Sequence, residues 1–317
     1  MRHIGYQPWL HRYAALTAVV ALLLPILMGA LVTTLDAGMA FPDYPTSDGH
    51  NMFLYPWLAS IGNRDKFLEH GHRLAGALVG TLSIGLAFWC WKADGRLWLR
   101  GLGIGVLLAV IAQGLIGGFR VIQDNRDAAM FHGVFASWIF AAMSIVSLAT
   151  SRSWFAETKS DAASLSTCRW TSWLFVVIVA AQYILGGMLR HRGMVVYEHI
   201  GFAAVVMLCG MFLFVTAANT RQPWLIRPAF LLMVCIVLQL LIGGATYVVR
   251  FGFGDYVAVH NSLPQIAVRT AHVLMGMLVW MLGVTLAVRV QRLISHSPQP
   301  EQVNVGTLNP ATGGGMS

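Results

Sequence analysis

Charged residues are scarce in this chain. Asp, Glu, Lys and Arg make up 11% of its 317 residues, against about a quarter in soluble domains. Hydrophobic residues make up 57%, and they gather in runs long enough for membrane-spanning helices, which a barrel strand does not need. The shortage of charge therefore excludes a soluble globular protein and predicts an all-α integral membrane protein in contact with the lipid bilayer.

Cysteine is also rare. The four cysteines, Cys90, Cys168, Cys209 and Cys235, form no close pair and no spacing typical of a metal site. None falls in a predicted outer loop, so we expect no structural disulfide. The first apolar run has no convincing small-residue cleavage site, and we interpret it as a retained helix.

No single basic patch accompanies the net charge of +8. The Lys and Arg residues lie between apolar segments, so we reject nucleic acid as a partner.

Eight apolar segments approach the roughly 20 residues that a helix needs to cross a bilayer. They are residues 13–35, 72–91, 102–119, 131–150, 170–189, 199–218, 228–249 and 271–290. Eight spans put both termini on one side. With that side inside, the inner segments carry 12 Lys and Arg residues and the outer segments carry 9. This bias predicts a multi-pass protein of the inner (cytoplasmic) membrane with both termini in the cytoplasm.

A motif recurs in the third, fifth and seventh segments, where Gln precedes a Gly-Gly pair. It reads AQGLIGG at 112–118, AQYILGG at 181–187 and LQLLIGG at 238–244. In the first segment Pro25 stands at the position equivalent to the glutamine, and Gly29 and Ala30 stand at the positions of the Gly-Gly pair. Close helix packing in lipid is a sufficient explanation of these glycines, but three repeats indicate a duplicated architecture.

The even segments each begin with a histidine, namely His72, His132, His199 and His272. Together with the Gly-Gly repeat, they predict two duplicated four-helix bundles related by a pseudo-twofold axis along the membrane normal. We place the first bundle at residues 1–160, the second at 161–294 and a disordered tail at 295–317. The long outer loops are expected at about 36–68 in the first half and 250–269 in the second.

The four histidines lie at one predicted depth, toward the outer face. Two histidines on facing helices can supply both axial ligands of a haem iron. The duplication then predicts two sites, His72 with His132 and His199 with His272. The alternative for each histidine is an ordinary interfacial residue, but four in register favour haem. The remaining histidines, including His70 and His191, are interpreted as solvated or interfacial.

Arginines lie close to the predicted haem sites. Because haem propionates are anionic and arginine pairs well with carboxylates, these side chains are candidate propionate contacts. Capping of helix ends at the membrane interface is an equal alternative. The candidates are Arg73, Arg120, Arg190, Arg250 and Arg269.

Glu69 breaks the symmetry between the halves. It precedes His72 by three residues, whereas Val196 stands in the equivalent place before His199. A carboxylate at a membrane edge is costly and indicates function. The first site thus carries a candidate acid, base or charge-stabilising group, while the second is typical of an electron-transfer haem.

The chain resembles the haem A synthase family of the COX15/CtaA type. The resemblance rests on EHGHR at 69–73, FHG at 131–133, HIG at 199–201, RTAH at 269–272 and the loop AGMAFPDYP at 37–45. Many bacterial members carry a cysteine pair in that first outer loop, and this chain has none there, which puts a thiol-dependent role in doubt.

The resemblance implies an enzyme that oxidises a methyl group of haem O to a formyl group, giving haem A for a-type terminal oxidases. It implies a stable haem b on His199 and His272, substrate haem O near His72 and His132, and Glu69 as the essential glutamate. Expected partners are haem O, a membrane electron donor such as a quinol or a ferredoxin-like protein, haem O synthase and oxidase assembly factors. The alternatives are a non-enzymatic bis-histidine b-type cytochrome and a haem-binding oxidase assembly factor.

Overall fold

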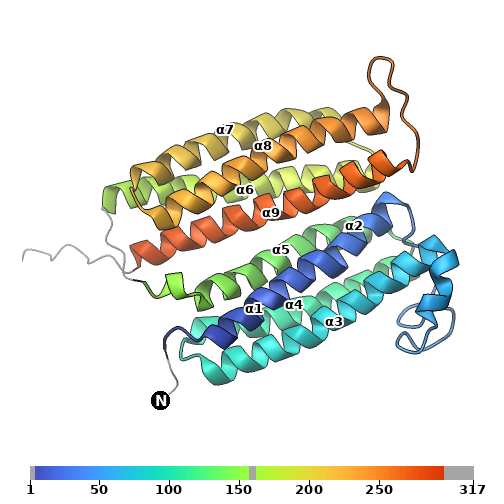
Figure 1. Cartoon of the computed structure of the whole chain (residues 1–317), viewed down its shortest axis with the longest axis horizontal. Coiled ribbons are helices and arrows are strands. Elements are labelled where there is room, and N and C mark those ends of the chain that lie inside the picture. Colours follow the sequence, from blue (N-terminus) through green and yellow to red (C-terminus); the bar gives the residue numbers. More distant parts are fainter. Residues whose placement is uncertain (1–3, 157–161, 296–317) are drawn as a thin grey trace, which may run out of the picture.

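The computed structural model of the protein describes residues 4–156 and 162–295, and within them eight apolar helical spans lie side by side (Figure 1). The first span joins α1 (Pro8–Ala21), a π-helical turn (Leu22–Ile26) and α2 (Leu27–Thr34). The others are α3 (Arg64–Ala93), α4 (Leu97–Ile122), α5 (Arg126–Thr150), α6 (Ala162–Arg192), α7 (Val196–Asn219), α8 (Pro223–Phe251) and α9 (Leu263–Ile294). The predicted all-α fold and its eight spans are confirmed.

The prediction that the histidines open their helices is wrong. α3 begins at Arg64, two turns before His72, and α5 begins at Arg126. Polar first turns precede the apolar residues, and their free N–H groups are capped by side chains. Asn63 accepts a hydrogen bond from the amide of Lys66, and Asn125 caps α5 in the same way. The hydropathy pattern reports only the apolar part of each helix, so it missed these turns.

The first span is irregular where the repeat motif has proline in place of glutamine. Pro25 lies inside the π-helical turn at Leu22–Ile26. Proline has no N–H group and crowds the preceding turn of an α-helix, and a π-helical turn relieves both problems. The span then continues as α2 and crosses the whole bundle.

The helices form two neighbouring groups. The first span packs against α3 and α5, and α4 closes that ring between α3 and α5. In the second group α6 packs against α7 and α9, and α8 closes the ring in the same manner. This shared order is compatible with a duplicated four-helix bundle. The boundary predicted at residues 160 and 161, and all of the predicted tail after residue 295, lie outside the described residues.

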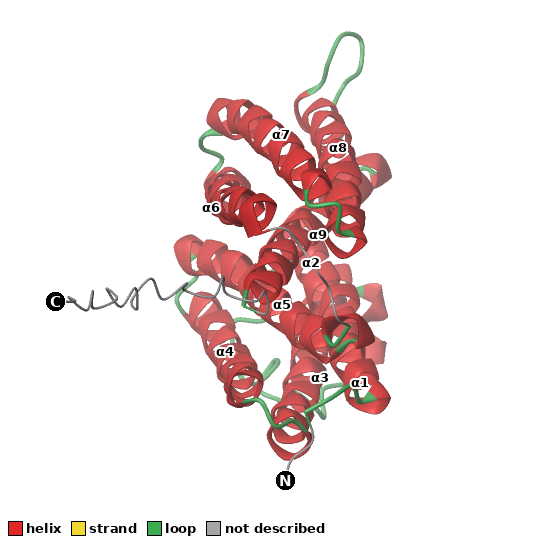
Figure 2. Cartoon of the chain, turned by 90° about the vertical axis from the view of Figure 1, so that its left-hand side faces the viewer, coloured by secondary structure: helices red, strands yellow, loops and turns green. Residues whose placement is uncertain are grey.

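The two groups are joined along α5 and α9, with α2 and α6 beside them (Figure 2). α5 and α9 have the largest buried shares among the eight spans. The indole of Trp280 on α9 donates a hydrogen bond of 3.0 Å to the carbonyl oxygen of Ser137 on α5. At the opposite end from the histidines, Arg292 donates to the carbonyl oxygen of Trp154. The halves therefore share polar contacts as well as an apolar seam.

Both long loops lie at one end of the molecule (Figure 1). The first follows α2 and contains a 3-10 helix at Trp57–Gly62. The second occupies residues 252–262, which is shorter than predicted because α8 and α9 extend into the expected loop. All four cysteines are buried and unpaired within the described part of the chain, as expected.

Candidate functional site

Each half of the protein brings two histidines together at the end that carries the long loops. His72 of α3 and His132 of α5 have ring centroids 6.2 Å apart and ring planes 78° apart. His199 of α7 and His272 of α9 repeat the arrangement, with centroids 6.2 Å apart and planes 80° apart. The structure thus assembles the same two pairs that the order of the sequence predicts.

Every one of these histidines lies against a glycine of the preceding span. A Cβ atom added to Gly29 or Gly117 would lie 2.9 Å from Cε1 of the facing imidazole, and one added to Gly186 or Gly243 would lie 3.1 Å away. The facing histidines are, in the same order, His72, His132, His199 and His272. A side chain larger than hydrogen would push the ring aside. The repeated glycine therefore sets where each imidazole lies, which packing between helix backbones alone does not explain.

One of the four imidazoles has its Nδ1 atom engaged by the backbone. Nδ1 of His72 lies 2.9 Å from the carbonyl oxygen of Pro25, the residue that replaces glutamine in the repeat. A carbonyl oxygen accepts a hydrogen bond from a protonated Nδ1, and that tautomer leaves Nε2 with its lone pair, which is the form that ligates a metal. The Nδ1 atoms of His132, His199 and His272 are buried without a hydrogen-bond partner among the described residues.

The glutamines of the repeat hold the histidine backbones in two of three cases. Gln113 donates a hydrogen bond of 2.9 Å to the carbonyl oxygen of His132, and Gln182 does the same to His199. Gln239 departs from this pattern, because its amide nitrogen lies 3.4 Å from Nε2 of His272. A contact of that length is a weak hydrogen bond.

The two pairs fit a haem iron. A metal–imidazole bond is about 2 Å long and the ring centre lies about 1 Å behind the nitrogen, so axial imidazoles on one iron have centroids roughly 6 Å apart. The observed separation agrees with this value in both halves. Among the described residues there is no cluster of three or more His, Cys, Asp or Glu side chains suited to a metal ion. Paired imidazoles are the donor set that a haem iron takes.

The glycine contact gives a test within a single motif. Gly243→Ala should disturb the ring of His272, whereas Gly244→Ala should not, because no atom lies within 4 Å of the position its Cβ would take. We expect haem content several-fold lower in Gly243→Ala and unchanged in Gly244→Ala, where alanine also favours the helix by about 1 kcal/mol. The measurement is the ratio of haem to protein after purification. Equal ratios in the two variants would show that the glycine does not set the imidazole.

Glu69 lies buried beneath the first outer loop. Its Oε2 atom accepts hydrogen bonds from the backbone amides of Ala40 at 2.7 Å and Phe41 at 3.3 Å. Its Oε1 atom pairs with Arg73 at 2.7 Å, and only 1% of the side chain is exposed. No hydrogen bond links Glu69 to His72 within the described residues. Glu69 is therefore held by the first outer loop and Arg73, whereas His72 is held by the first span.

Arg73 and Asp43 fix the loop above Glu69. Arg73 donates to the carbonyl oxygens of Asp43 and Thr46 as well as to Glu69. Burial raises the pKa of Asp43, but hydrogen bonds from Thr46 and from the amides of Gly49 and Asp48 outweigh it and leave that pKa below its ordinary value. Because Arg73 uses its donors here, it is the most fully engaged of the five candidate arginines.

The other candidate arginines lie at the same end of the bundles. Arg120 at the end of α4 lies over Gly38 of the loop, and Arg250 at the end of α8 is exposed. Arg190 and Arg269 belong to the second half but donate to α2 of the first, at Thr34. These contacts between the halves were not predicted, because α2 and α9 lie more than 200 residues apart in the sequence.

The interpretation of His70 as solvated or interfacial is wrong, and His191 is also partly withdrawn from water. His70 is fully buried, with Nδ1 3.0 Å from Oγ of Ser47 in the first outer loop. His191, interpreted as solvated or interfacial, is partly buried, and its Nε2 atom would lie 3.8 Å from a Cβ on Gly133. The basic run at the end of α6 was the only available signal for His191.

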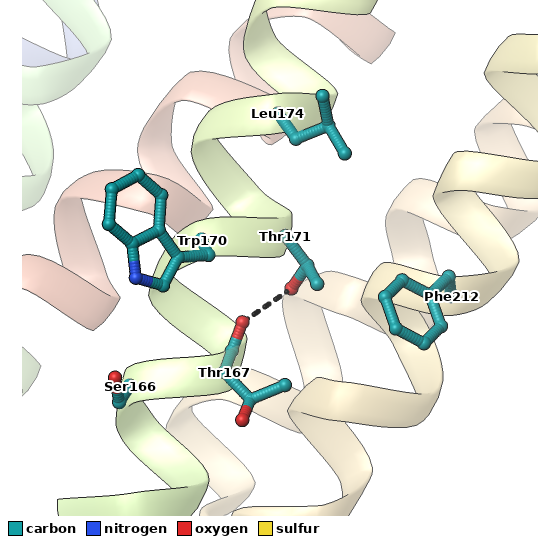
Figure 3. A pocket seen from close by; sticks show the side chains of 6 residues that line it. All are labelled: Ser166, Thr167, Trp170, Thr171, Leu174 and Phe212. Atoms are coloured by element: carbon teal, nitrogen blue, oxygen red, sulfur yellow. Dashed lines mark hydrogen bonds between the residues drawn. The ribbon is translucent and has the colours of Figure 1, made fainter.

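An open depression on the second half lies elsewhere. It has a volume of about 480 Å³ and is lined by residues of α6 and α7, where Thr171 donates a hydrogen bond to the carbonyl oxygen of Thr167 (Figure 3). Trp170 and Phe212 on its rim are largely exposed, as expected of a surface in contact with lipid. No ionisable side chain lines it, so the histidine pairs remain the candidate site.

Parts of the chain are similar to known proteins. Residues 59–200 match the model of the family COX15-CtaA, described as a cytochrome oxidase assembly protein. A curated heme A synthase of Lysinibacillus sphaericus is 27% identical over 197 residues, which is 60% of each chain. That of Symbiobacterium thermophilum is 27% identical over 189 residues, 57% of this chain and 60% of the relative.

A heme A synthase of Cereibacter sphaeroides reaches 33% identity over 135 residues, 37% of this chain and 34% of the relative. The chain therefore matches between about a third and three fifths of the length of these relatives. The region matched by the family model contains Glu69, His72, His132 and His199, and it ends before His272.

Proposed function

We propose that the protein is a haem A synthase, from the premise that residues 59–200 match the COX15-CtaA family. It would oxidise a methyl group of haem O to a formyl group and so supply haem A to a-type terminal oxidases. The observation that carries the proposal is the pair of matching histidine sites. Among the described residues, only the first has a buried carboxylate, Glu69, one turn before its histidine on the same helix.

We assign the second-half site to a resident haem b, held by His199 and His272. We assign the first-half site to substrate haem O, near His72 and His132. Bound haem iron would supply the redox chemistry that protein side chains lack. Each half of the chain contributes two imidazoles, which glycine contacts hold in position. One histidine of each pair lies on α5 or α9, the two helices that pack together between the halves.

Glu69 is the proposed catalytic residue. Its carboxylate lies in the interior, where charge acts more strongly than in water. Arg73 and the loop amides hold it in one orientation. In this role it accepts a proton, or stabilises positive charge that develops near the reacting methyl group.

Five arginines surround the two histidine pairs. Arg120, Arg190, Arg250 and Arg269, with Arg73, are assigned to haem propionates, since all five lie at the histidine end. The bias of basic residues toward the other end supports a cytoplasmic-membrane protein with cytoplasmic termini and haem sites toward the outer face. A membrane electron donor, haem O synthase and oxidase assembly factors are the partners this role requires.

The test is pigment analysis of the purified protein. Expressed in cells that supply haem O, it should yield haem A or a hydroxylated haem O in acid–acetone extracts separated by chromatography. Haem b alone, with haem O present in the same membranes, would instead identify a b-type cytochrome. Unmodified haem O without product would identify a haem-binding assembly factor.

A further inference from the structure

The last turn of α6 carries three consecutive basic residues that all contact the first half. Arg190 donates to the carbonyl oxygen of Ala30 on α2, and Arg192 forms an ion pair with Asp127 on α5. His191 lies between them in sequence, and its ring lies against Gly133 of α5. Successive residues of a helix point about 100° apart, so the end of α6 must be inserted between α2 and α5.

His191 reaches the first-half histidine pair by this route. Gly133 directly follows His132 in α5, and the Nε2 atom of His191 would be only 3.8 Å from a Cβ at that glycine. The ring of His191 is close enough to His132 and to Arg120 for electrostatic interaction with both. A residue of the second half thus borders the site assigned to the substrate.

The polar groups of His191 and Arg120 are not used by the protein. Neither ring nitrogen of His191, and no nitrogen of Arg120, has a hydrogen bond to any residue in the parts of the chain that the structure describes. The nearby acids have other partners, because Glu69 pairs with Arg73 and Asp127 pairs with Arg192. The charges of Glu69 and Asp124 act on Arg120 from a distance, but neither acid accepts a hydrogen bond from it among the described residues. A partly buried imidazole beside a partly buried guanidinium, both with free donors, is the chemistry that receives a carboxylate.

We infer that His191 donates a hydrogen bond to a carboxylate of the porphyrin that binds between His72 and His132, beside Arg120. The inference rests on the proposed function, since it takes that porphyrin to be the substrate. The substrate site is then completed by a residue of the other half. Arg190, the residue before His191, fastens the end of α6 to α2 and so brings His191 there.

The experiment is a titration of the full chain, with haem b already bound in its second half, by haem O and by the dimethyl ester of haem O. The change in Soret absorbance gives a dissociation constant for each ligand. His191→Leu should weaken haem O roughly ten- to a hundred-fold, the effect of losing a hydrogen bond to a charged group. The ester should distinguish His191→Leu from the native protein much less, because its uncharged carbonyl oxygens accept weaker hydrogen bonds than a carboxylate. His191→Gln, which keeps a donor, should recover part of the affinity.

Arg192→Gln is the matched control. It breaks an exposed ion pair of the same helix turn, which contributes little to stability, and should leave the affinity for haem O unchanged. The spectrum of the resident haem b reports whether each variant is folded. The inference is overturned if His191→Leu binds haem O as the native protein does, or if it loses haem O and the ester alike. If the native protein makes no haem A while the selective loss is still observed, the carboxylate contact stands and the proposed reaction is wrong.

Discussion

Alanine at His199 or at His272 is expected to leave the purified protein without its stable haem. Each substitution removes one of two imidazoles whose centroids lie 6.2 Å apart, so a bound iron would lose one of its two protein ligands. Mutating even an outer partner of a metal ligand costs about 10- to 100-fold in affinity, and loss of the ligand itself should cost more. The haem-to-protein ratio and the reduced-minus-oxidised spectrum measure the effect.

The duplication supplies matched controls for this prediction. His72→Ala and His132→Ala remove imidazoles in the same geometry, each against its own glycine, so they create similar cavities. They should keep the resident haem b and lose only the binding of haem O. His260→Ala, in the second outer loop, should change neither. Loss of haem b from the first-half variants, with the second-half variants still loaded, would reverse the assignment of the two sites.

The second large effect is expected at Glu69. Glu69→Gln should stop formation of haem A while the resident haem b stays bound, because the carboxylate serves the first site alone. The buried ion pair complicates the result, because Glu69→Gln leaves the charge of Arg73 without its partner. Breaking a buried pair in this way lowers the stability of a protein by about 3–5 kcal/mol. A single substitution therefore does not separate chemistry from folding.

A second variant separates the two roles of Glu69. Glu69→Gln combined with Arg73→Met removes both charges of the pair, so no buried charge is left alone. If Glu69 acts in catalysis, the double variant still binds haem O but makes no haem A, although its thermal unfolding midpoint rises toward that of the native protein. Recovery of haem A in the double variant would show that Glu69 only balances Arg73. The product is measured by chromatography of extracted haem and the midpoint by loss of the haem spectrum on heating.

Much of the architecture could be predicted from the sequence, because membrane helices are encoded by length and hydropathy. The eight spans were recognisable from apolar runs, and the two histidine pairs followed from the order of the repeat. The helix ends were not recognisable, since Asn63 and Asn125 cap polar turns that no hydropathy pattern contains. The sequence also does not show that Gly243 contacts a histidine and Gly244 does not. Adjacent glycines can be distinguished only once the position of the facing helix is known.

The sequence by itself determined the membrane class, the number of spans and which histidines would meet, because these depend on local composition and on a period that repeats along the chain. Only the tertiary structure decided what surrounds them. In the folded protein Glu69 accepts hydrogen bonds from amides of the first outer loop, and each of the four paired imidazoles packs against a glycine. The fold also brings His191 against the other half. Those contacts join residues that are distant in the chain, and their partners are set by how helices pack, which no local pattern records.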